Sequence, residues 1–319
     1  MQGWRKRMED SHIADLNLGK SAHLFGVFDG HGGKEVAQFV KKHFADELKK
    51  NKNYQKGNYK AALTETFLRM DEMCLEPSGQ LELKEENRIS KEEDELYEKN
   101  NPNQKNDIYA QLITKIKNDD SVWMLTGCTA TVCLIIDGKM YFANAGDSRI
   151  VLSKNGSAYA MTIDHKPDLD SEKNRIYKAE GWVAEGRVKG NLNLSRSLGD
   201  MEYKQNKKLK PEQQMITAYP EIVEENFSDA CDFLIIGCDG IWDCKTNQEA
   251  VDYVYSILKK NPNTKLSSIL ENMFDEIIAP DLYTGIDIIY INLMLNCLET
   301  GVGCDNMTCI IVQFKKKKK

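Results

Sequence analysis

Residues 28–33 combine residue types that could do chemistry at the end of an apolar strand. The run 24–28 predicts a buried strand, and Asp29, Gly30 and His31 follow it, with two more glycines after them. Glycines allow positive φ angles and a close approach of the backbone to a ligand. The aspartate could therefore bind a metal ion and the histidine could donate a proton, although so short a motif could equally be a tight turn.

Further acidic residues lie beside other strand-like runs or near the N-terminus. They are Asp147, Asp239, Asp243 and Asp305, and the first segment adds Glu9 and Asp10 beside Arg5. Carboxylates that converge in a buried place repel one another unless a counter-charge is present. Hard divalent cations such as Mg²⁺ or Mn²⁺ supply that charge and prefer oxygen ligands. The pattern therefore predicts a metal centre.

These residue types together indicate phosphoester hydrolysis. Two metal ions about 3.5–4 Å apart can stabilise both the attacking and the leaving oxygen of a displacement. An arginine can bind two phosphate oxygens through its planar fork, and a histidine can protonate a departing alkoxide. A cysteine-dependent phosphatase is excluded, because no cysteine has an arginine six residues later. The run 168–170 lacks the glycine that an EF-hand calcium loop needs at its sixth position.

The composition is typical of a globular protein and excludes some classes of partner. The 319 residues are 41% hydrophobic and 29% charged. A net charge of -6 gives no overall basic field for nucleic acid. No apolar run approaches the roughly 20 residues of a membrane span. Nine cysteines, an odd number without an export signal, indicate reduced thiols and an intracellular protein, cytoplasmic or nuclear.

Hydrophobic spacing predicts helices and antiparallel strands in separate parts of the chain. Helices are expected over 34–50, 60–74, 171–179, 246–258, 266–278 and 286–298. Strands are expected over 24–28, 130–136, 140–143, 150–153, 158–162, 233–237 and 307–314, with hairpin turns at 137–138 and 154–156. The charged stretch at about 76–120 is expected to be a solvated insertion, partly helical or disordered. This order favours an α+β fold.

Eight ordered motifs carry a resemblance to a known family. They read GWRKRMED at 3–10, FDGHGG at 28–33, GCTA at 127–130, AGDSR at 145–149, DHKP at 164–167, LSRSLGD at 194–200, CDGIWD at 238–243 and GCDNMT at 303–308. In these motifs the chain resembles the metal-dependent Ser/Thr protein phosphatases of type 2C. The insertion and parts of the last third are not covered by the motifs.

The resemblance implies a fold and a domain organisation. It implies a four-layer α-β-β-α sandwich with two central antiparallel sheets, formed by one catalytic domain over 1–319. The insertion at about 76–120 interrupts this domain, and a basic tail at 315–319 ends it. Family members usually have a further strand upstream of the first motif. We therefore expect either a trimmed N-terminus or a first sheet without that edge strand.

The resemblance also implies a binuclear centre with two Mn²⁺ or Mg²⁺ ions. Asp29 matches the carboxylate that bridges both ions, and Gly30 matches a ligand that binds through its backbone carbonyl. Asp239 and Asp305 match ligands of one ion. Glu9 matches a ligand of the other ion, either directly or through water.

The remaining site residues have less central roles in the resemblance. Asp10 is expected close behind Glu9. Arg5 matches the phosphate clamp, and His31 matches the general acid. Asp147 and Asp243, together with Asp239, match positions tied to a weaker third metal. Segment 167–188 resembles the family's variable flap, whereas Asp200 and Arg196 are expected to support the fold without touching metal.

The activity implied is hydrolysis of phosphoserine and phosphothreonine in protein substrates. A water or hydroxide that bridges the two metals would attack phosphorus directly, without a phosphoenzyme, and the protein would be a monomer. Two other functions stay open. One is an inactive, phosphatase-like binding protein, which a complete ligand set disfavours. The other is a metal-dependent hydrolase that acts on small or lipid phosphates.

Overall fold

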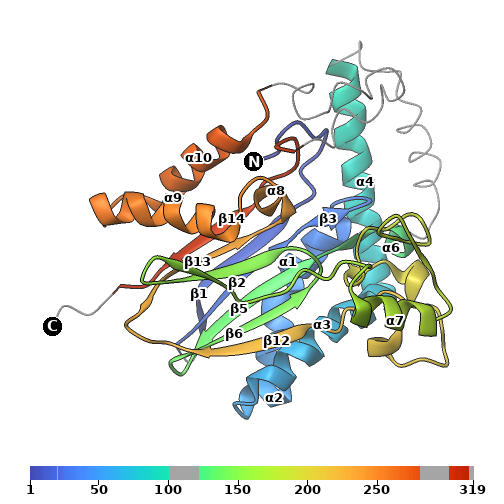
Figure 1. Ribbon diagram of the computed structural model, residues 1–319. Coiled ribbons are helices and arrows are strands. Elements are labelled where there is room, and N and C mark those ends of the chain that lie inside the picture. The colour runs from blue at the N-terminus through green and yellow to red at the C-terminus, as the bar shows by residue number, and fades with distance from the viewer. Residues whose placement is uncertain (20, 101–121, 281–301, 316–319) are drawn as a thin grey trace.

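The computed structural model describes residues 1–19, 21–100, 122–280 and 302–315 (Figure 1). The predicted helix over 286–298, the second part of the insertion and residues 316–319 of the basic tail lie outside these ranges. Helices and antiparallel sheets make up the described chain, so the predicted α+β class is confirmed.

The larger sheet has five strands in the order β1-β2-β5-β6-β12, and every neighbouring pair is antiparallel. Its strands are β1 (Ser11–Gly19), β2 (Ala22–Phe28), β5 (Ala130–Ile136), β6 (Lys139–Ala145) and β12 (Glu221–Asn226). The predicted hairpin turn at 137–138 joins β5 to β6, where Ile136 pairs with Lys139.

The second sheet has four strands in the order β14-β13-β7-β8, also antiparallel. Its strands are β7 (Arg149–Lys154), β8 (Ser157–Ala160), β13 (Cys231–Gly237) and β14 (Cys309–Gln313). Two smaller sheets are built from β3 (Gly30–His31), β4 (Gly127–Cys128) and β11 (Leu198–Gly199), and from β9 (Val183–Ala184) and β10 (Arg187–Val188).

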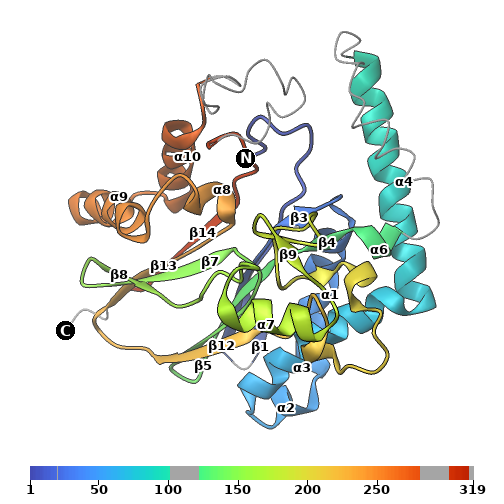
Figure 2. The same ribbon diagram turned by 45° about the vertical axis from the view of Figure 1, so that its right-hand side comes forward.

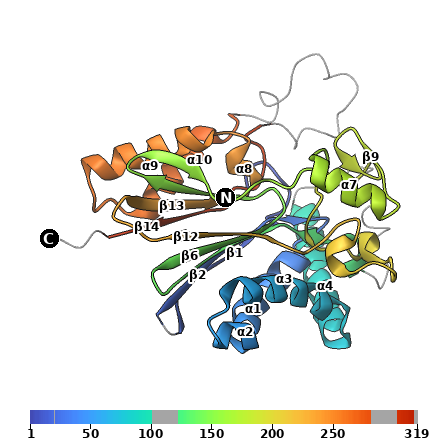
Figure 3. The same cartoon turned by 60° about the horizontal axis from the view of Figure 1, so that its bottom comes forward.

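The two main sheets face each other, and helices cover their outer faces (Figure 3). Alternation along β2 explains this packing, because successive strand residues point to opposite faces. Leu24 and Phe28 contact the helices α1 and α3, whereas Phe25 and Val27 lie between the sheets. Strand β13 alternates in the same way between the second sheet's outer helices, α9 and α10, and the layer between the sheets.

The helices follow the predicted spacing closely. They are α1 (Glu35–Lys50), α2 (Lys52–Gln55), α3 (Tyr59–Leu75), α4 (Pro77–Asn100), α6 (Val122–Leu125), α7 (Asp170–Lys178), α8 (Asp239–Trp242), α9 (Asn247–Lys260) and α10 (Leu266–Ile277), with 3₁₀ turns at Met201–Lys204 and Pro211–Gln213. Thr246 and Glu249 form a capping box at the start of α9, where the helix predicted over 246–258 begins. Among the described residues, none of the helices is both long and apolar enough to span a bilayer.

Helix α4 occupies the first part of the predicted insertion. It extends away from the two sheets (Figure 2). Its first half packs on the body through buried Leu83, Asn87 and Ser90. This spacing of four and three residues places the three side chains on one face of the helix. Two of the three are polar, so a search for hydrophobic spacing did not find this face.

Candidate metal centre

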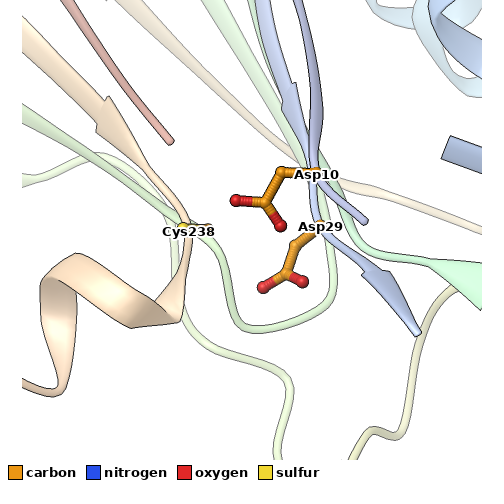
Figure 4. A group of neighbouring side chains, drawn as sticks. All are labelled: Asp10, Asp29 and Cys238. Atoms are coloured by element: carbon orange, nitrogen blue, oxygen red, sulfur yellow. The ribbon is translucent and has the colours of Figure 1, made fainter. Parts of the chain in front are cut away.

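Strand register brings the first two acidic motifs together. Ser11 of β1 pairs with Phe28 of β2, so Asp10 and Asp29 lie side by side just beyond this pair. Cys238 follows the end of β13 in the facing sheet. Ligand atoms of Asp10, Asp29 and Cys238 all lie within 4.8 Å of one another (Figure 4).

The strand register of the second sheet brings the other aspartates close to Asp10 and Asp29. Gly237, the last residue of β13, pairs with Arg149 at the start of β7 and with Cys309 at the start of β14. Asp239 lies two residues after Gly237. Asp147 and Asp305 precede β7 and β14 by a few residues. The aspartates therefore reach one edge of the sheets from both layers.

The carboxylates raise one another's proton affinity. Burial and the negative charges of Asp239, Asp10, Asp147 and Asp305 raise the pKa of Asp29 well above its usual value. Burial, Asp147, Asp305 and Asp243 raise the pKa of Asp239 to about 8. Such mutual repulsion is the expected cost of assembling acidic ligands in the absence of a counter-charge.

Asp10 shows that this site suits a cation. The residue is 6% exposed, and both of its carboxylate oxygens are buried with no hydrogen-bond partner among the described residues. A buried carboxylate without a partner is costly unless it is neutralised. Burial raises the pKa of Asp10, the neighbouring Thr308, Cys238 and Asp29 side chains offset only part of this rise, and the charge of Asp305 adds to it. Oxygen donors without partners, gathered at one place, fit hard divalent cations.

Asn306, which the sequence motif included without a role, ties the N-terminal segment to the centre. Its Nδ2 donates to Gln2 O at 2.7 Å and to Arg7 O at 2.9 Å, and its Oδ1 accepts from Glu9 N at 2.8 Å. Its own backbone N donates to Asp305 Oδ1 at 2.6 Å. One amide side chain therefore positions Glu9 beside Asp305.

Gly30 lies where no side chain fits. A Cβ at this position would lie 2.4 Å from Glu9 O, closer than real Cβ contacts allow. The absence of a side chain therefore lets the backbone that carries Glu9 run directly against the backbone after Asp29. This close approach places Glu9 and Gly30 at the same edge of the centre.

Arg5 and Lys166 bring positive charge to the rim. Arg5 Nη2 donates to Asp305 Oδ2 at 2.6 Å. The Lys166 ammonium group ion-pairs with Asp147, a residue that is 2% exposed. The exposed Asp243 lies near enough to affect the same lysine, whose pKa is raised because Asp147, Asp239 and Asp243 outweigh the opposing effect of burial. The sequence did not single out Lys166.

His31 lies beside Asp200 rather than alone. His31 Nε2 and Asp200 Oδ2 are 2.7 Å apart. Burial tends to lower the pKa of His31, but the charge and hydrogen bond of Asp200 outweigh it, so the pKa is raised. Asp200 was expected to support the fold without touching metal, and in the structure its carboxylate contacts the candidate general acid.

The structure brings the ten predicted site residues to one region and leaves other candidates elsewhere. Arg196 binds Glu172 in the segment after β8, with Nη2 2.6 Å from Glu172 Oε1. Asp164 forms an ion pair with Arg149, with Oδ2 2.6 Å from Arg149 Nη2. Buried His165 accepts a hydrogen bond from Gly146 N at 3.3 Å, and its Nε2 lies 3.5 Å from Glu221 Oε2.

Comparison with known sequences gives the family. A sequence profile described as "Protein phosphatase 2C" matches residues 1–87 and 77–283. The chain belongs to the protein phosphatase 2C family. Probable protein phosphatase 2C 6 of Paramecium tetraurelia is 45% identical over 315 residues, covering 99% of this chain and 90% of the relative. Probable protein phosphatase 2C 21 of Arabidopsis thaliana is 43% identical, covering 99% of this chain and 85% of the relative.

Solved structures show the same fold at lower identity. A phosphatase from a pathogenic strain of Toxoplasma gondii matches with a TM-score of 0.62 and 21% identity, covering 86% of this chain and 85% of that one. A serine-threonine phosphatase 2C from the same organism also gives a TM-score of 0.62, at 18% identity and with 86% of each chain covered. The sequence-based family assignment is therefore confirmed, and the chain is a protein phosphatase of this family with an acidic cluster that could bind metal.

Proposed function

We propose that this chain hydrolyses phosphoserine and phosphothreonine in proteins with two divalent cations, Mn²⁺ or Mg²⁺, at the acidic cluster. The observation that carries the proposal is the convergence of Asp10, Asp29 and Asp239, none of which has an ion pair within the described part of the chain. When bound, such cations supply positive charge for the phosphate and activate water for direct attack on phosphorus, without a phosphoenzyme.

The acidic cluster offers enough donors for two ions. Asp29 would bind both ions, and Asp239 and Asp305 would complete the ligands of one of them. Glu9, Asp10 and the backbone carbonyl of Gly30 would bind the other ion. Asp147 and Asp243 would hold a weaker third cation at the rim, where Lys166 now neutralises Asp147.

Arg5 would bind the substrate phosphate. Its side chain is 39% exposed, and its guanidinium group pairs with Asp305, which is itself one of the proposed ligands. Binding of a cation to Asp305 would release the guanidinium fork for two phosphate oxygens. Arg5 thereby orients the phosphorus for in-line attack.

His31 would protonate the departing serine or threonine oxygen. Although burial opposes it, the charge of Asp200 raises the pKa of His31 and so favours the imidazolium form that donates the proton. Since Nε2 is engaged by Asp200, Nδ1 is the ring nitrogen available to the substrate. A poor alkoxide leaving group needs this proton more than a stable phenolate does.

Several finer features belong to the same proposal. The packing of helices on two facing sheets supports a four-layer α-β-β-α sandwich in one domain over 1–319. All eight described cysteines are free, which supports an intracellular location. A monomer is the simplest assembly, since all the proposed ligands come from one chain.

The test is hydrolysis of a phosphothreonine peptide, p-nitrophenyl phosphate, and a panel of small and lipid phosphates. We expect turnover of the peptide with Mn²⁺ or Mg²⁺, loss in excess EDTA, and no recovery for Asp239→Asn. Full activity in excess EDTA would contradict the metal requirement. Cation binding by calorimetry without turnover of any phosphopeptide would favour a binding protein, and preference for lipid phosphates would favour the third alternative.

A further inference from the structure

A glycine separates His31 from Asp200 in the three-stranded sheet β11-β4-β3. Gly127 is in the central strand, with His31 opposite it on one side and Gly199 opposite it on the other. A Cβ at Gly127 would lie 2.3 Å from Asp200 Oδ2 and 2.7 Å from His31 Nε2. The hydrogen bond between the two side chains therefore crosses the central strand through the space that a side chain would fill.

The backbone conformation at Gly199 and Asp200 directs the Asp200 carboxylate into this space. Asp200 adopts a left-handed conformation with φ 51°, directly after Gly199 with φ 79°. A non-glycine residue pays conformational free energy to stay there, so surrounding contacts must hold it. Asp200 N donates to Thr126 O at 2.9 Å, and Gly199 N donates to Asp71 Oδ1 at 2.9 Å.

A buried network fixes the carboxylate further. Ser197 Oγ donates to Asp200 Oδ2 at 2.5 Å. Lys204 Nζ bridges Ser197 O at 2.8 Å and Asp71 Oδ2 at 2.6 Å, which connects the turn to helix α3. Asp200 is only 2% exposed. Its carboxylate is therefore a fixed acceptor with one face directed at His31.

We propose that Asp200 positions the general acid His31. The missing side chain of Gly127 leaves the space through which the Asp200 carboxylate reaches His31 Nε2. The inference rests on the proposed function, because it assumes that His31 donates the proton. The Asp200 carboxylate accepts a hydrogen bond from Nε2–H and holds the ring in one orientation and one tautomer. Nδ1 then faces the substrate and donates its proton to the alkoxide as the bond from phosphorus to oxygen breaks.

The first test compares two substrates for Asp200→Asn. Asparagine keeps the size of the side chain but removes its charge and can present an N–H to the imidazole. We expect kcat on a phosphothreonine peptide to fall at least about tenfold, with less than about threefold loss on p-nitrophenyl phosphate, whose phenolate leaves without protonation. Equal losses on both substrates would show a merely structural role and overturn the proposal.

A double-mutant cycle separates this inference from the proposed function. If Asp200 acts through His31, then adding Asp200→Asn to His31→Ala causes little further loss on the peptide. Additive losses would overturn the positioning role alone. If His31→Ala lowers kcat equally on the peptide and on p-nitrophenyl phosphate, His31 is not the general acid. The positioning role of Asp200 is then also excluded.

Gly127→Ala tests whether the space beside Gly127 must stay empty, and it leaves His31 and Asp200 unchanged. Gly127 does not have a positive φ, so the added methyl group acts through its contact with the pair. We expect the same substrate-dependent loss as for Asp200→Asn. Gly79→Ala is the matched control, because its Cβ would also clash, at 1.9 Å from Met73 O, but at the remote start of α4. The control should lose stability without any difference between the two substrates.

The tautomer of His31 gives a readout that does not depend on turnover. In ¹⁵N-histidine-labelled wild-type protein, neutral His31 should carry its proton on Nε2, and only five histidines need assignment. Asp200→Asn and Gly127→Ala should shift His31 toward a mixture of tautomers. If either variant folds and keeps the wild-type tautomer, the proposal is overturned for that contact.

Discussion

Arg5 Nη2 lies 2.6 Å from Asp305 Oδ2, so the first motif of the chain is ion-paired with the last, 300 residues away. Both side chains are about one-third exposed, at 39% and 32%. Exposed pairs of this kind contribute only about 0–1 kcal/mol to stability. The pair therefore holds Arg5 at the rim without making it a structural requirement.

Replacement of Arg5 should impair substrate binding more than stability. We expect Arg5→Ala to raise KM for a phosphopeptide at least about tenfold, which corresponds to about 1.4 kcal/mol, with a Tm within about 2 °C of wild type. Arg5→Lys keeps the charge but loses the planar fork, so it should recover only part of the affinity. An unchanged KM for Arg5→Ala would remove Arg5 from the phosphate site.

The metal-free protein should lose stability as the pH rises. The pKa of Asp239 is about 8 in the folded chain, against an ordinary value of 3.8. Between these values the folded state holds a proton that the unfolded state has released, so the free energy of unfolding falls with increasing pH. In EDTA we expect Tm to fall by about 5 °C or more from pH 5 to pH 8.

Two comparisons isolate the cause of that pH dependence. Saturating Mn²⁺ should abolish or reverse the fall, because the cation replaces the proton as the counter-charge. Asp239→Asn should reduce the fall in EDTA, because it removes the titrating group. A wild-type Tm in EDTA that is flat or rises over this range would contradict the repulsion that we infer among the carboxylates.

A buried ionic cluster should hold the flap segment on the body. Glu172 is 1% exposed and binds Arg175 at 2.5 Å and Arg196 at 2.6 Å. Burial would raise the pKa of Glu172, but the two arginines outweigh it and hold the pKa at about 2. Glu172→Ala leaves two guanidinium groups without their carboxylate, which costs about 3–5 kcal/mol. We expect Tm to fall by about 6 °C or more in thermal unfolding.

A residue on the same helix provides the control for this cluster. Lys178→Ala changes an exposed side chain of α7 and should leave Tm within about 1–2 °C of wild type. If Glu172→Ala is no less stable than Lys178→Ala, the cluster does not anchor the flap.

Lys166 should compete with a weak third cation. Its ammonium group neutralises Asp147 at the position where that ion would bind. Lys166→Met removes the internal counter-charge, so we expect the weakest Mn²⁺ site measured by calorimetry to tighten at least about threefold, with the two stronger sites little changed. Weaker binding at that site would instead assign Lys166 a role in building it.

Local signals in the sequence were sufficient to predict most elements. Helix α9 begins at the predicted place, and the hairpin from β5 to β6 turns at the predicted Asp137 and Gly138. Both are predictable because helix caps and tight turns depend on a few adjacent residues. Helix α4 was harder to predict from the sequence, because its packing face includes the buried polar residues Asn87 and Ser90.

The residues of the candidate site could be predicted where the residue type alone indicates the chemistry. Contacts that depend on how the strands align could not be predicted from the sequence. Strand-end aspartates are recognisable by themselves. The partnership of His31 with Asp200 is not, because 169 residues separate them and the contact requires β3, β4 and β11 to align on Gly127. Lys166 and Asn306 were missed as site residues for the same reason, since only the fold shows what they contact.

The most direct test of the account is to count Mn²⁺ ions and measure turnover in the same samples of wild type and Asp29→Asn. Asp29 is the proposed bridge, so removal of its charge should weaken both strong sites together. Equilibrium dialysis should find at least two ions per wild-type chain, and fewer than one per Asp29→Asn chain under the same conditions, with phosphopeptide hydrolysis lost in parallel. Two ions per chain and intact turnover in Asp29→Asn would contradict the central claim.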